Sequence, residues 1–277
     1  MDIKASDVKA LRDSTGAGLS DCKKALVESN GDLAAAEKLL KEKGLAAMAK
    51  RTDRTAAEGR IVVKQDGNRI AMVEVLCETD FVANNEDFIA VAEKAAEVTL
   101  EKKASGVLPE HVALIETILV KFRENMSVKR AVYVEVPAGS VASTYVHHDK
   151  KIGVLVVVKG SEADSVKEFA HVCCLHLASF KPDYVSKDQV PQSYIDEQTE
   201  IFKAQMAEDP AMAKKPENVK EGILKGKISK LVASNCFMEQ GYLDNEKITV
   251  TQALAEAGKA CNATLSFDNV ILYVLGK

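Results

Sequence analysis

The chain has 277 residues, of which 47% are hydrophobic and 28% charged, and its formal net charge is -4. This balance is typical of a globular protein with one large or two medium domains. Nucleic-acid-binding domains usually carry a clearly basic stripe, so RNA or DNA is not expected as a direct ligand. The sequence shows no signal-peptide pattern and no apolar run of ~18 to 20 residues, which predicts a cytoplasmic protein that does not span a membrane.

The cysteines give no sign of a disulfide framework or a metal site. They form no CxxC pair and no Cys/His spacing suited to zinc, so we expect reduced, mostly buried thiols and no cofactor. Six are present: Cys22, Cys77, Cys173, Cys174, Cys236 and Cys261.

Residues 1–45 predict a domain of three short helices. The first carries Val8 and Leu11 inward and ends at "STGAG", where glycines permit backbone angles that other residues avoid. The second runs from Ser20, its expected N-cap, to Ser29.

The third helix is expected to begin after the N-cap Asp32 and to end at Gly44. A module of this size is suited to docking on another protein. Residues 46–58, "AAMAKRTDRTAAE", are polar apart from small residues and predict a linker.

Residues 59–138 predict an α+β subdomain in the order strand, strand, helix, helix, strand. "RIVVK" and "RIAMVEVLC" are joined by Asp66-Gly67, a strong hairpin signal. Helices are expected over roughly 85–103 and 110–124, and "RAVYVEV" is the closing strand.

The same order of elements returns over residues 139–277, with helices at about 164–180 and 250–262. Aligning Ile61 with Val141 needs an offset of 80 residues, and Ile70 with Ile152 needs 82. The sequence therefore predicts an internal duplication packed as two α+β halves.

The second half is interrupted at about 190–235 by a charged helical segment. Pro210 and Pro216 cannot lie inside a continuous helix, so we expect two antiparallel arms forming a coiled-coil hairpin. Such an arm favours binding to a partner or self-association, as a homodimer or a higher complex, over a purely stabilising role.

No motif indicates covalent catalysis, and the chain is expected not to be an enzyme. The glycine-rich "TGAGLSDCKK" lacks the spacing of a phosphate-binding loop, and Cys173-Cys174 lies on an apolar helix typical of a core. His147-His148-Asp149 is read first as a solvated hairpin turn. A metal- or histidine-dependent enzyme centred there stays open as an alternative.

The segment "LCETDFVANNEDF" presents a phenylalanine directly after a strand. Thr79 or Asp80 is expected to cap the next helix, and Phe81 could fold back onto that helix as a hydrophobic staple. An offset of 82 aligns 79–81 with residues 161–163, which read Ser-Glu-Ala. The capping chemistry should therefore recur but the aromatic does not, which favours a Phe81 that faces a partner.

Several segments together resemble the bacterial elongation factor Ts family across nearly the whole chain. They are "LRDSTGAGLSDCKKALVESNGDLAAAEKLL", "ETDFVA" at 78–83, "YVHHDKKIGVLVVVKG", "LASFKPDYV" and "CFMEQGYLDNEKITVTQAL". The resemblance implies a UBA-like three-helix domain, a duplicated core and an inserted helical hairpin.

The resemblance also implies a function, namely guanine nucleotide exchange on the translation GTPase EF-Tu in its GDP-bound and nucleotide-free forms. In the family the Asp-Phe pair enters the GTPase's nucleotide domain, which implies partner contacts for Thr79, Asp80, Phe81 and Val82. The Tyr-x-His pattern implies a further contact for His147, and "DCKKAL" implies one for Lys23.

The sequence departs from the family at two places. Asn235-Cys236-Phe237 stands where the family usually has Gln-Pro-Phe. The resemblance therefore implies an EF-Tu contact in this segment for Phe237 alone. An extra C-terminal helix found in some members has no match after "LYVLGK". A scaffold or chaperone-like protein that binds through the N-terminal helices and the hairpin, without driving exchange, remains an alternative.

Overall fold

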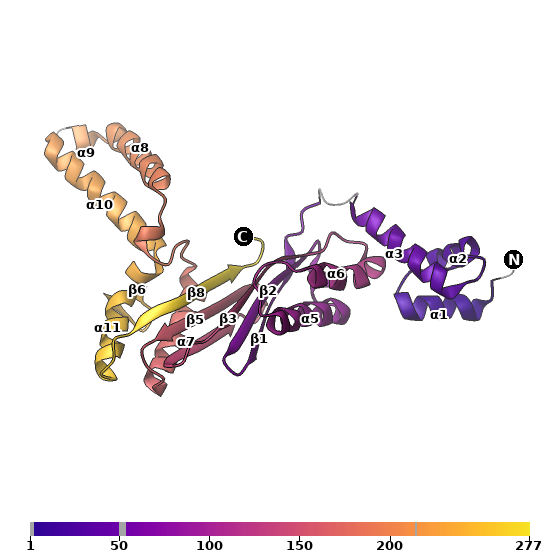
Figure 1. The fold of residues 1–277 in the computed structure, drawn as a ribbon. Helices are drawn as coiled ribbons and strands as arrows, with labels where there is room; N and C mark the ends of the chain where they lie inside the picture. Colours follow the sequence, from indigo (N-terminus) through magenta and orange to yellow (C-terminus); the bar gives the residue numbers. More distant parts are fainter. Residues whose placement is uncertain (1–2, 50–53, 214) are drawn as a thin grey trace. The chain divides into compact units, whose positions relative to one another are not determined.

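The computed structural model describes residues 3–49, 54–213 and 215–277 (Figure 1). The chain divides into two compact units. Unit 1 contains the chain up to Pro137 together with Val146–Gly153 and Tyr273–Lys277, and unit 2 contains Ala138–Tyr145 and Val154–Leu272.

The N-terminal part of unit 1, within residues 3–49, consists of the helices α1 (Ala5–Thr15), α2 (Leu19–Glu28) and α3 (Leu33–Ala49). The predicted N-cap Asp32 is confirmed, because its Oδ1 accepts hydrogen bonds from the amides of Ala34 and Ala35 at 2.9 and 3.1 Å. The predicted N-cap Ser20 is wrong, since α2 already begins one residue earlier. Buried side chains from all three helices and the α1–α2 loop form one small core: Leu11, Ala17, Cys22, Ala25, Leu26, Ala36 and Leu40.

Gly44 does not end the third helix, contrary to the prediction. Helix α3 continues to Ala49, so the first part of the predicted 46–58 linker is helical, and residues 50–53 lie outside the described residues. A Cβ on Gly44 would lie 3.1 Å from Cγ2 of Val120 on α6 (Pro109–Phe122). The glycine therefore permits close approach of two helices rather than helix termination.

The sheet of unit 1 is antiparallel, with the strand order β1 (Glu58–Asp66), β2 (Arg69–Cys77), β3 (Ser127–Glu135). The predicted hairpin is confirmed, because Asp66 pairs with Arg69 and Gly67 adopts a φ of 59°. A bulge interrupts the β2–β3 ladder between Glu74 and Val75.

Two helices of unit 1, α5 (Glu86–Lys102) and α6, pack beside this sheet (Figure 1). The helical spacing of the apolar residues in α5 places Phe88, Val91, Ala92, Ala95 and Ala96 in the core. They pack with Val73 and Val75 of β2 and with Ile115 and Leu119 of α6.

A buried histidine fixes the start of α6. His111 is fully buried, and its Nδ1 accepts a hydrogen bond from the Leu108 amide at 3.1 Å. Its Nε2 lies 3.1 Å from the Ala95 carbonyl oxygen and 3.0 Å from the Thr99 hydroxyl. This arrangement suits the neutral imidazole, and burial lowers the pKa of His111 below its usual value of 6.5.

Glu74 is a buried carboxylate on β2 that holds the C-terminal residues in unit 1. Its oxygens accept from Arg130 Nε at 2.5 Å and from the Gly276 amide at 2.8 Å. The Arg130 guanidinium also lies over the Tyr273 ring, 4.0 Å from the ring centroid. An ion pair with cation–π support satisfies a charge that would otherwise be costly to bury.

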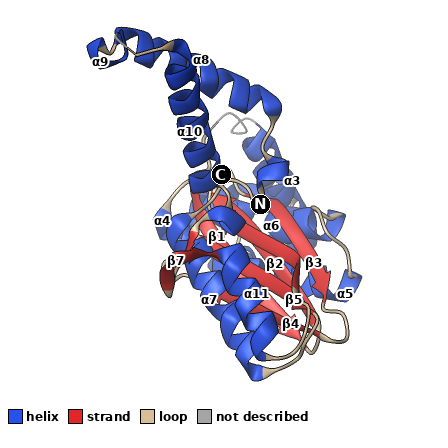
Figure 2. Ribbon diagram, turned by 90° about the vertical axis from the view of Figure 1, so that its left-hand side faces the viewer, coloured by secondary structure: helices blue, strands red, loops and turns tan. Residues whose placement is uncertain are grey.

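The second three-stranded sheet, most of whose residues belong to unit 2, has the strand order β4 (Ser140–Val146), β5 (Ile152–Lys159), β8 (Ser266–Val274). The helices α7 (Asp164–Phe180) and α11 (Val250–Ala260) pack together, as Figure 2 shows. A short hairpin of β6 (Gly241–Tyr242) and β7 (Asn245–Thr249) was not expected from the sequence. Two one-turn helices were not expected either: η1 (Lys187–Gln189), earlier in the chain, and η2 (Phe237–Glu239), directly before this hairpin.

The order of elements repeats between the two halves, as the sequence predicted. Helices α5 and α7 have 17 residues each and are followed by Lys103 and Lys181, both left-handed with φ of 52° and 47°. The halves differ in α4 (Asp80–Ala83), because the fully described segment between β5 and α7 contains no helix.

The expected recurrence of the cap is wrong. The Ser161 hydroxyl accepts a hydrogen bond from the Ala163 amide at 3.2 Å, but α7 starts after Ala163 without a side-chain cap. The whole capped turn at 79–83 is therefore a feature of the first half.

The interruption of the second half forms α8 (Gln192–Glu208), α9 (Pro210–Ala213) and α10 (Glu217–Asn235). The predicted break is confirmed, since Pro210 opens α9 and Pro216 precedes α10. Helices α8 and α10 lie side by side and extend away from the strands of unit 2 (Figures 1 and 2). Within the described residues of this hairpin, Met206 is buried on α8 and no residue is buried on α10, so its apolar seam is thin.

Candidate functional site

The capped turn α4 presents the Asp-Phe pair. Thr79 has extended backbone angles and its hydroxyl accepts a hydrogen bond from the Val82 amide at 3.4 Å, which confirms it as an N-cap. Asn84 Nδ2 donates to the Asp80 carbonyl oxygen at 2.9 Å at the other end of the turn. The local sequence therefore builds one closed turn directly after β2.

Phe81 points to solvent. Its side chain is 85% exposed, and no other large hydrophobic residue in the described part of the chain is more exposed. The next two residues, Val82 and Ala83, are 7% and 4% exposed and anchor the turn to the core. The staple interpretation is wrong, because Phe81 does not pack back onto the following helix.

Asp80 is exposed beside Phe81, and its charge acts on Lys151, the residue that follows the 147–150 turn of unit 1. Lys151 forms an ion pair with Glu58, in which its Nζ lies 2.7 Å from Oε2 of Glu58. The hydrogen bond to Glu58 is the main cause of a raised Lys151 pKa, and the charges of Asp149 and Asp80 act in the same direction. Asp80 therefore shares an electrostatic neighbourhood with the 147–150 turn.

The turn that carries His147 is tied down by backbone hydrogen bonds. The His147 amide donates to the Ile152 carbonyl at 2.9 Å, and the Lys150 amide donates to the His147 carbonyl at 2.9 Å. The Ile61 amide on β1 donates to the Lys150 carbonyl at 2.8 Å. His147 is half-buried, with its ring 4.3 Å from that of His148. The structure thus brings the predicted residues 79–82 and His147 into one unit.

Lys23 lies on the exposed face of α2. Leu19 and Val27, four residues before and after it, are 53% and 54% exposed, while Cys22 and Leu26 face the core. Residues four apart share a helix face, so Lys23 is the centre of an exposed apolar strip. Sequence reasoning missed the two apolar residues, although their spacing on the face opposite the core stripe was visible.

Phe237 occupies a different environment, in η2 of unit 2. Its side chain is fully buried, with ring centroids 5.3 Å from Phe267 and 5.4 Å from His176. Core packing accounts for this residue, and a partner contact through it remains a prediction.

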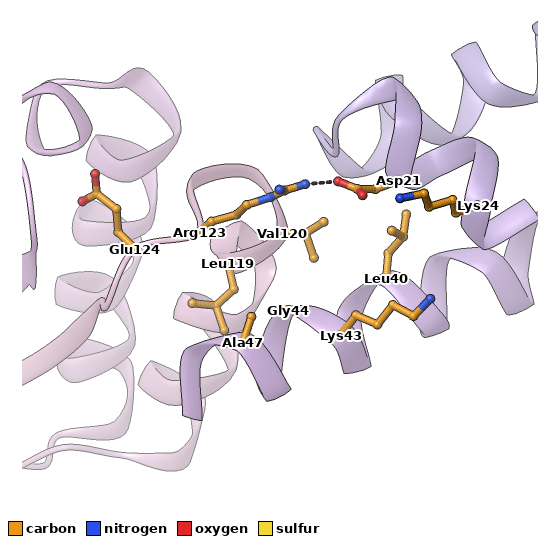
Figure 3. A pocket seen from close by; sticks show the side chains of 10 residues that line it. All are labelled: Asp21, Lys24, Leu40, Lys43, Gly44, Ala47, Leu119, Val120, Arg123 and Glu124. Atoms are coloured by element: carbon orange, nitrogen blue, oxygen red, sulfur yellow. Dashed lines mark hydrogen bonds and ion pairs between the residues drawn. The ribbon is translucent and has the colours of Figure 1, made fainter. Parts of the chain in front are cut away.

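A cavity of about 210 Å³ lies where α2 and α3 meet α6 (Figure 3). Three of the charged residues in its wall form ion pairs: Arg123 pairs with Asp21, as Figure 3 shows, and Lys43 pairs at 2.7 Å with Glu28 outside the wall. The cavity therefore belongs to the docking of the N-terminal helices on α6.

Five of the six thiols are buried, and Cys261 is partly buried. Burial raises the pKa of Cys77 and of Cys174 to about 12, and burial also raises the pKa of Cys173. Thiols in this state are poor nucleophiles. No group of three or more His, Cys, Asp or Glu in the described residues is arranged to hold a metal ion. None of the described helices is long and apolar enough to cross a bilayer.

Comparison with known proteins places the chain in the class of translation elongation factors. The family model described as Elongation factor TS matches residues 78–277, beginning at the residue before Thr79. The Elongation factor Ts of Treponema denticola is 50% identical over 281 residues, covering 100% of this chain and 99% of the relative. That of Treponema pallidum is 41% identical over 292 residues, with the same coverage. That of Borrelia recurrentis is 37% identical over 266 residues, 94% of each chain. The chain belongs to the elongation factor Ts family.

Proposed function

We propose that this chain is the guanine nucleotide exchange factor of the GTPase EF-Tu and acts in the cytoplasm. It binds EF-Tu·GDP, disturbs the Mg²⁺ and phosphate site, promotes GDP release and leaves when GTP binds. Membership of the family supports the role in translation elongation. The observation that carries the exchange step is Phe81, an 85% exposed aromatic on a short capped turn.

The mechanism is coupling between two binding events, without bond chemistry. A factor that binds nucleotide-free EF-Tu more tightly than EF-Tu·GDP must weaken GDP binding by the same ratio. Each tenfold loss of GDP affinity takes about 1.4 kcal/mol of differential binding. Burial of a phenylalanine side chain supplies about 1.5 to 3 kcal/mol, if its pocket opens only when GDP has left.

Each site residue has a role in this proposal. Phe81 inserts into the nucleotide domain of EF-Tu and is called the wedge below. Asp80 beside it acts on the groups of EF-Tu that support Mg²⁺ and phosphate. Thr79 and Val82 hold the turn in place through its cap and its buried anchor. His147 contacts the same domain of EF-Tu from the neighbouring turn.

Two further surfaces complete the contact. Lys23 and its apolar strip on α2 dock the N-terminal helices on EF-Tu. The hairpin of α8 and α10 is a surface for a partner or for self-association. Phe237 is a further proposed contact with EF-Tu; its side chain is buried, so the contact involves the surface of η2 that it supports. Neither nucleic acid nor a membrane takes part.

Stopped-flow measurement of labelled GDP leaving EF-Tu, with and without this protein, tests the proposal. We expect release to accelerate with factor concentration and to reach a plateau, and excess GTP to dissociate the complex. Binding to EF-Tu without faster release would contradict exchange and support a scaffold role.

A further inference from the structure

We propose that Glu124 is the residue that positions the Asp80-Phe81 turn for its partner. The proposal rests on the exchange function above and extends it to a side chain outside the 78–83 segment. Glu124 follows α6 and is distant in sequence from the turn. Its carboxylate accepts hydrogen bonds from the Glu78 amide and from the Thr79 hydroxyl, directly before α4.

The Glu124 carboxylate accepts hydrogen bonds from the start of the turn. Its Oε2 accepts from the amides of Glu78 and Thr79 at 3.0 and 3.1 Å. Its Oε1 accepts from the Thr79 hydroxyl at 2.6 Å. A hydroxyl has one proton, so donation to Glu124 turns its lone pairs toward the Val82 amide, the group that the N-cap must satisfy. Glu124 thereby sets the rotamer of the cap.

The contact is reciprocal. Glu78 Oε1 accepts from the Asn125 amide at 2.7 Å, so each segment gives a carboxylate to the backbone of the other. Arg54 Nη1 lies 3.3 Å from Glu78 Oε2, and Asn125 Nδ2 donates to the Arg54 carbonyl at 2.8 Å. Hydrogen bonds to carboxylates are the stronger kind, and together these lock the end of β2 against the end of α6.

Cys77 adds a further restraint. Its Sγ lies 3.2 Å from the Thr79 carbonyl oxygen, which also accepts from the Ala83 amide at 3.1 Å. Burial first, and the Glu124 charge second, raise the pKa of Cys77 to about 12, which keeps the thiol protonated as a donor.

The end of α6 is suited to this role because it is rigid. Ile115, Ile118 and Leu119 fix the helix in the core, and Arg123 ends it in a left-handed conformation with φ of 55°. In Figure 3, Arg123 points toward Asp21, and the Glu124 side chain lies on the opposite side of Arg123 from Asp21. A four-residue helix is not stable by itself, so its geometry must come from such a platform.

The functional consequence is preorganisation. A turn held in its binding geometry loses less conformational entropy on docking. Glu124→Ala leaves the amides of Glu78 and Thr79 without this acceptor, so Phe81 samples other positions. We expect the maximal rate of factor-stimulated GDP release to fall about 10-fold.

A double-mutant cycle tests this against a general structural effect. Phe81→Ala, Glu124→Ala and the double variant are compared for stimulated GDP release, with unfolding temperatures measured for each. If Glu124 acts through Phe81, its replacement costs little in the Phe81→Ala background. Fully additive losses would overturn the proposal.

The control is Glu110→Ala, on the first turn of the same helix, where the carboxylate lies 2.5 Å from Lys102 at the surface. We expect this variant to match the wild type. Glu124→Gln keeps one acceptor oxygen and should fall between wild type and Glu124→Ala. If Glu124→Ala does not fold, Glu124→Gln replaces it in the double-mutant cycle with Phe81→Ala.

Amide hydrogen exchange at Val82 and Ala83 measures how often the hydrogen bonds of the turn open, and it needs no EF-Tu. We expect faster exchange at these amides in Glu124→Ala or Glu124→Gln and no change in Glu110→Ala. Unchanged exchange in both Glu124 variants would overturn the positioning role. This readout still decides the role of Glu124 if the wild-type protein proves not to accelerate GDP release, a result that would defeat the exchange function alone.

Discussion

Replacing Phe81 with alanine removes the proposed wedge while sparing the fold. The side chain is 85% exposed, and the turn is held by Val82, Ala83 and the Thr79 cap, none of which changes. Unfolding free energy should therefore stay within about 0.5 kcal/mol of the wild type. In the complex, loss of about 1.5 to 3 kcal/mol of aromatic burial corresponds to roughly a 10- to 100-fold slower stimulated release of GDP.

The assay is stopped-flow fluorescence of labelled GDP on EF-Tu at saturating factor concentration. Phe180→Ala is the matched control, since Phe180 is also partly exposed, at 47%, but lies at the end of α7 in unit 2. We expect this control to release GDP at the wild-type rate. Wild-type release by Phe81→Ala, at an unchanged unfolding temperature, would show that Phe81 is not the wedge.

Three further predictions concern stability. The pKa of His111 is lowered in the fold, so below the ordinary value near 6.5 the unfolded chain binds a proton that the folded chain does not. Stability should fall between pH 7.5 and 5.5 with a slope of up to about 1.4 kcal/mol per pH unit from this group. His111→Gln should show a shallower slope in urea unfolding; an equal slope would exclude His111 as the cause. Gly44→Leu should cost about 1 to 3 kcal/mol, because its side chain meets Val120. Gly226→Leu, in open space on α10, should not destabilise; equal losses in thermal unfolding would contradict this. Deletion of residues 191–234 should weaken partner or self-association but keep unfolding cooperative, and loss of cooperativity would assign the hairpin a structural role.

Locally coded features could be predicted from the sequence. Helix α7 occupies Asp164–Phe180 as expected, and the Asp66-Gly67 hairpin forms, because periodicity and turn chemistry act between near neighbours. Gly44 failed as a stop signal because its role depends on Val120, which is distant in the chain. The short strands β6 and β7 carry too few residues for a periodic signal.

The candidate site also contains features that local sequence predicts and features that depend on residues distant in the chain. The Thr79 cap follows from local sequence, and the exposure of Phe81 was favoured by comparison of the two halves. The Glu124 contacts and the action of the Asp80 charge on Lys151 depend on tertiary packing, which no local pattern encodes.

The most direct test of the coupling mechanism compares two affinity ratios, one for this protein and one for GDP. The affinity of this protein for nucleotide-free EF-Tu and for EF-Tu·GDP is measured by titration, and the affinity of GDP for EF-Tu is measured with and without saturating factor. We expect both ratios to be equal and greater than one, and both to shrink together in Phe81→Ala. Equal affinity of the factor for the two forms of EF-Tu would contradict the proposed exchange mechanism.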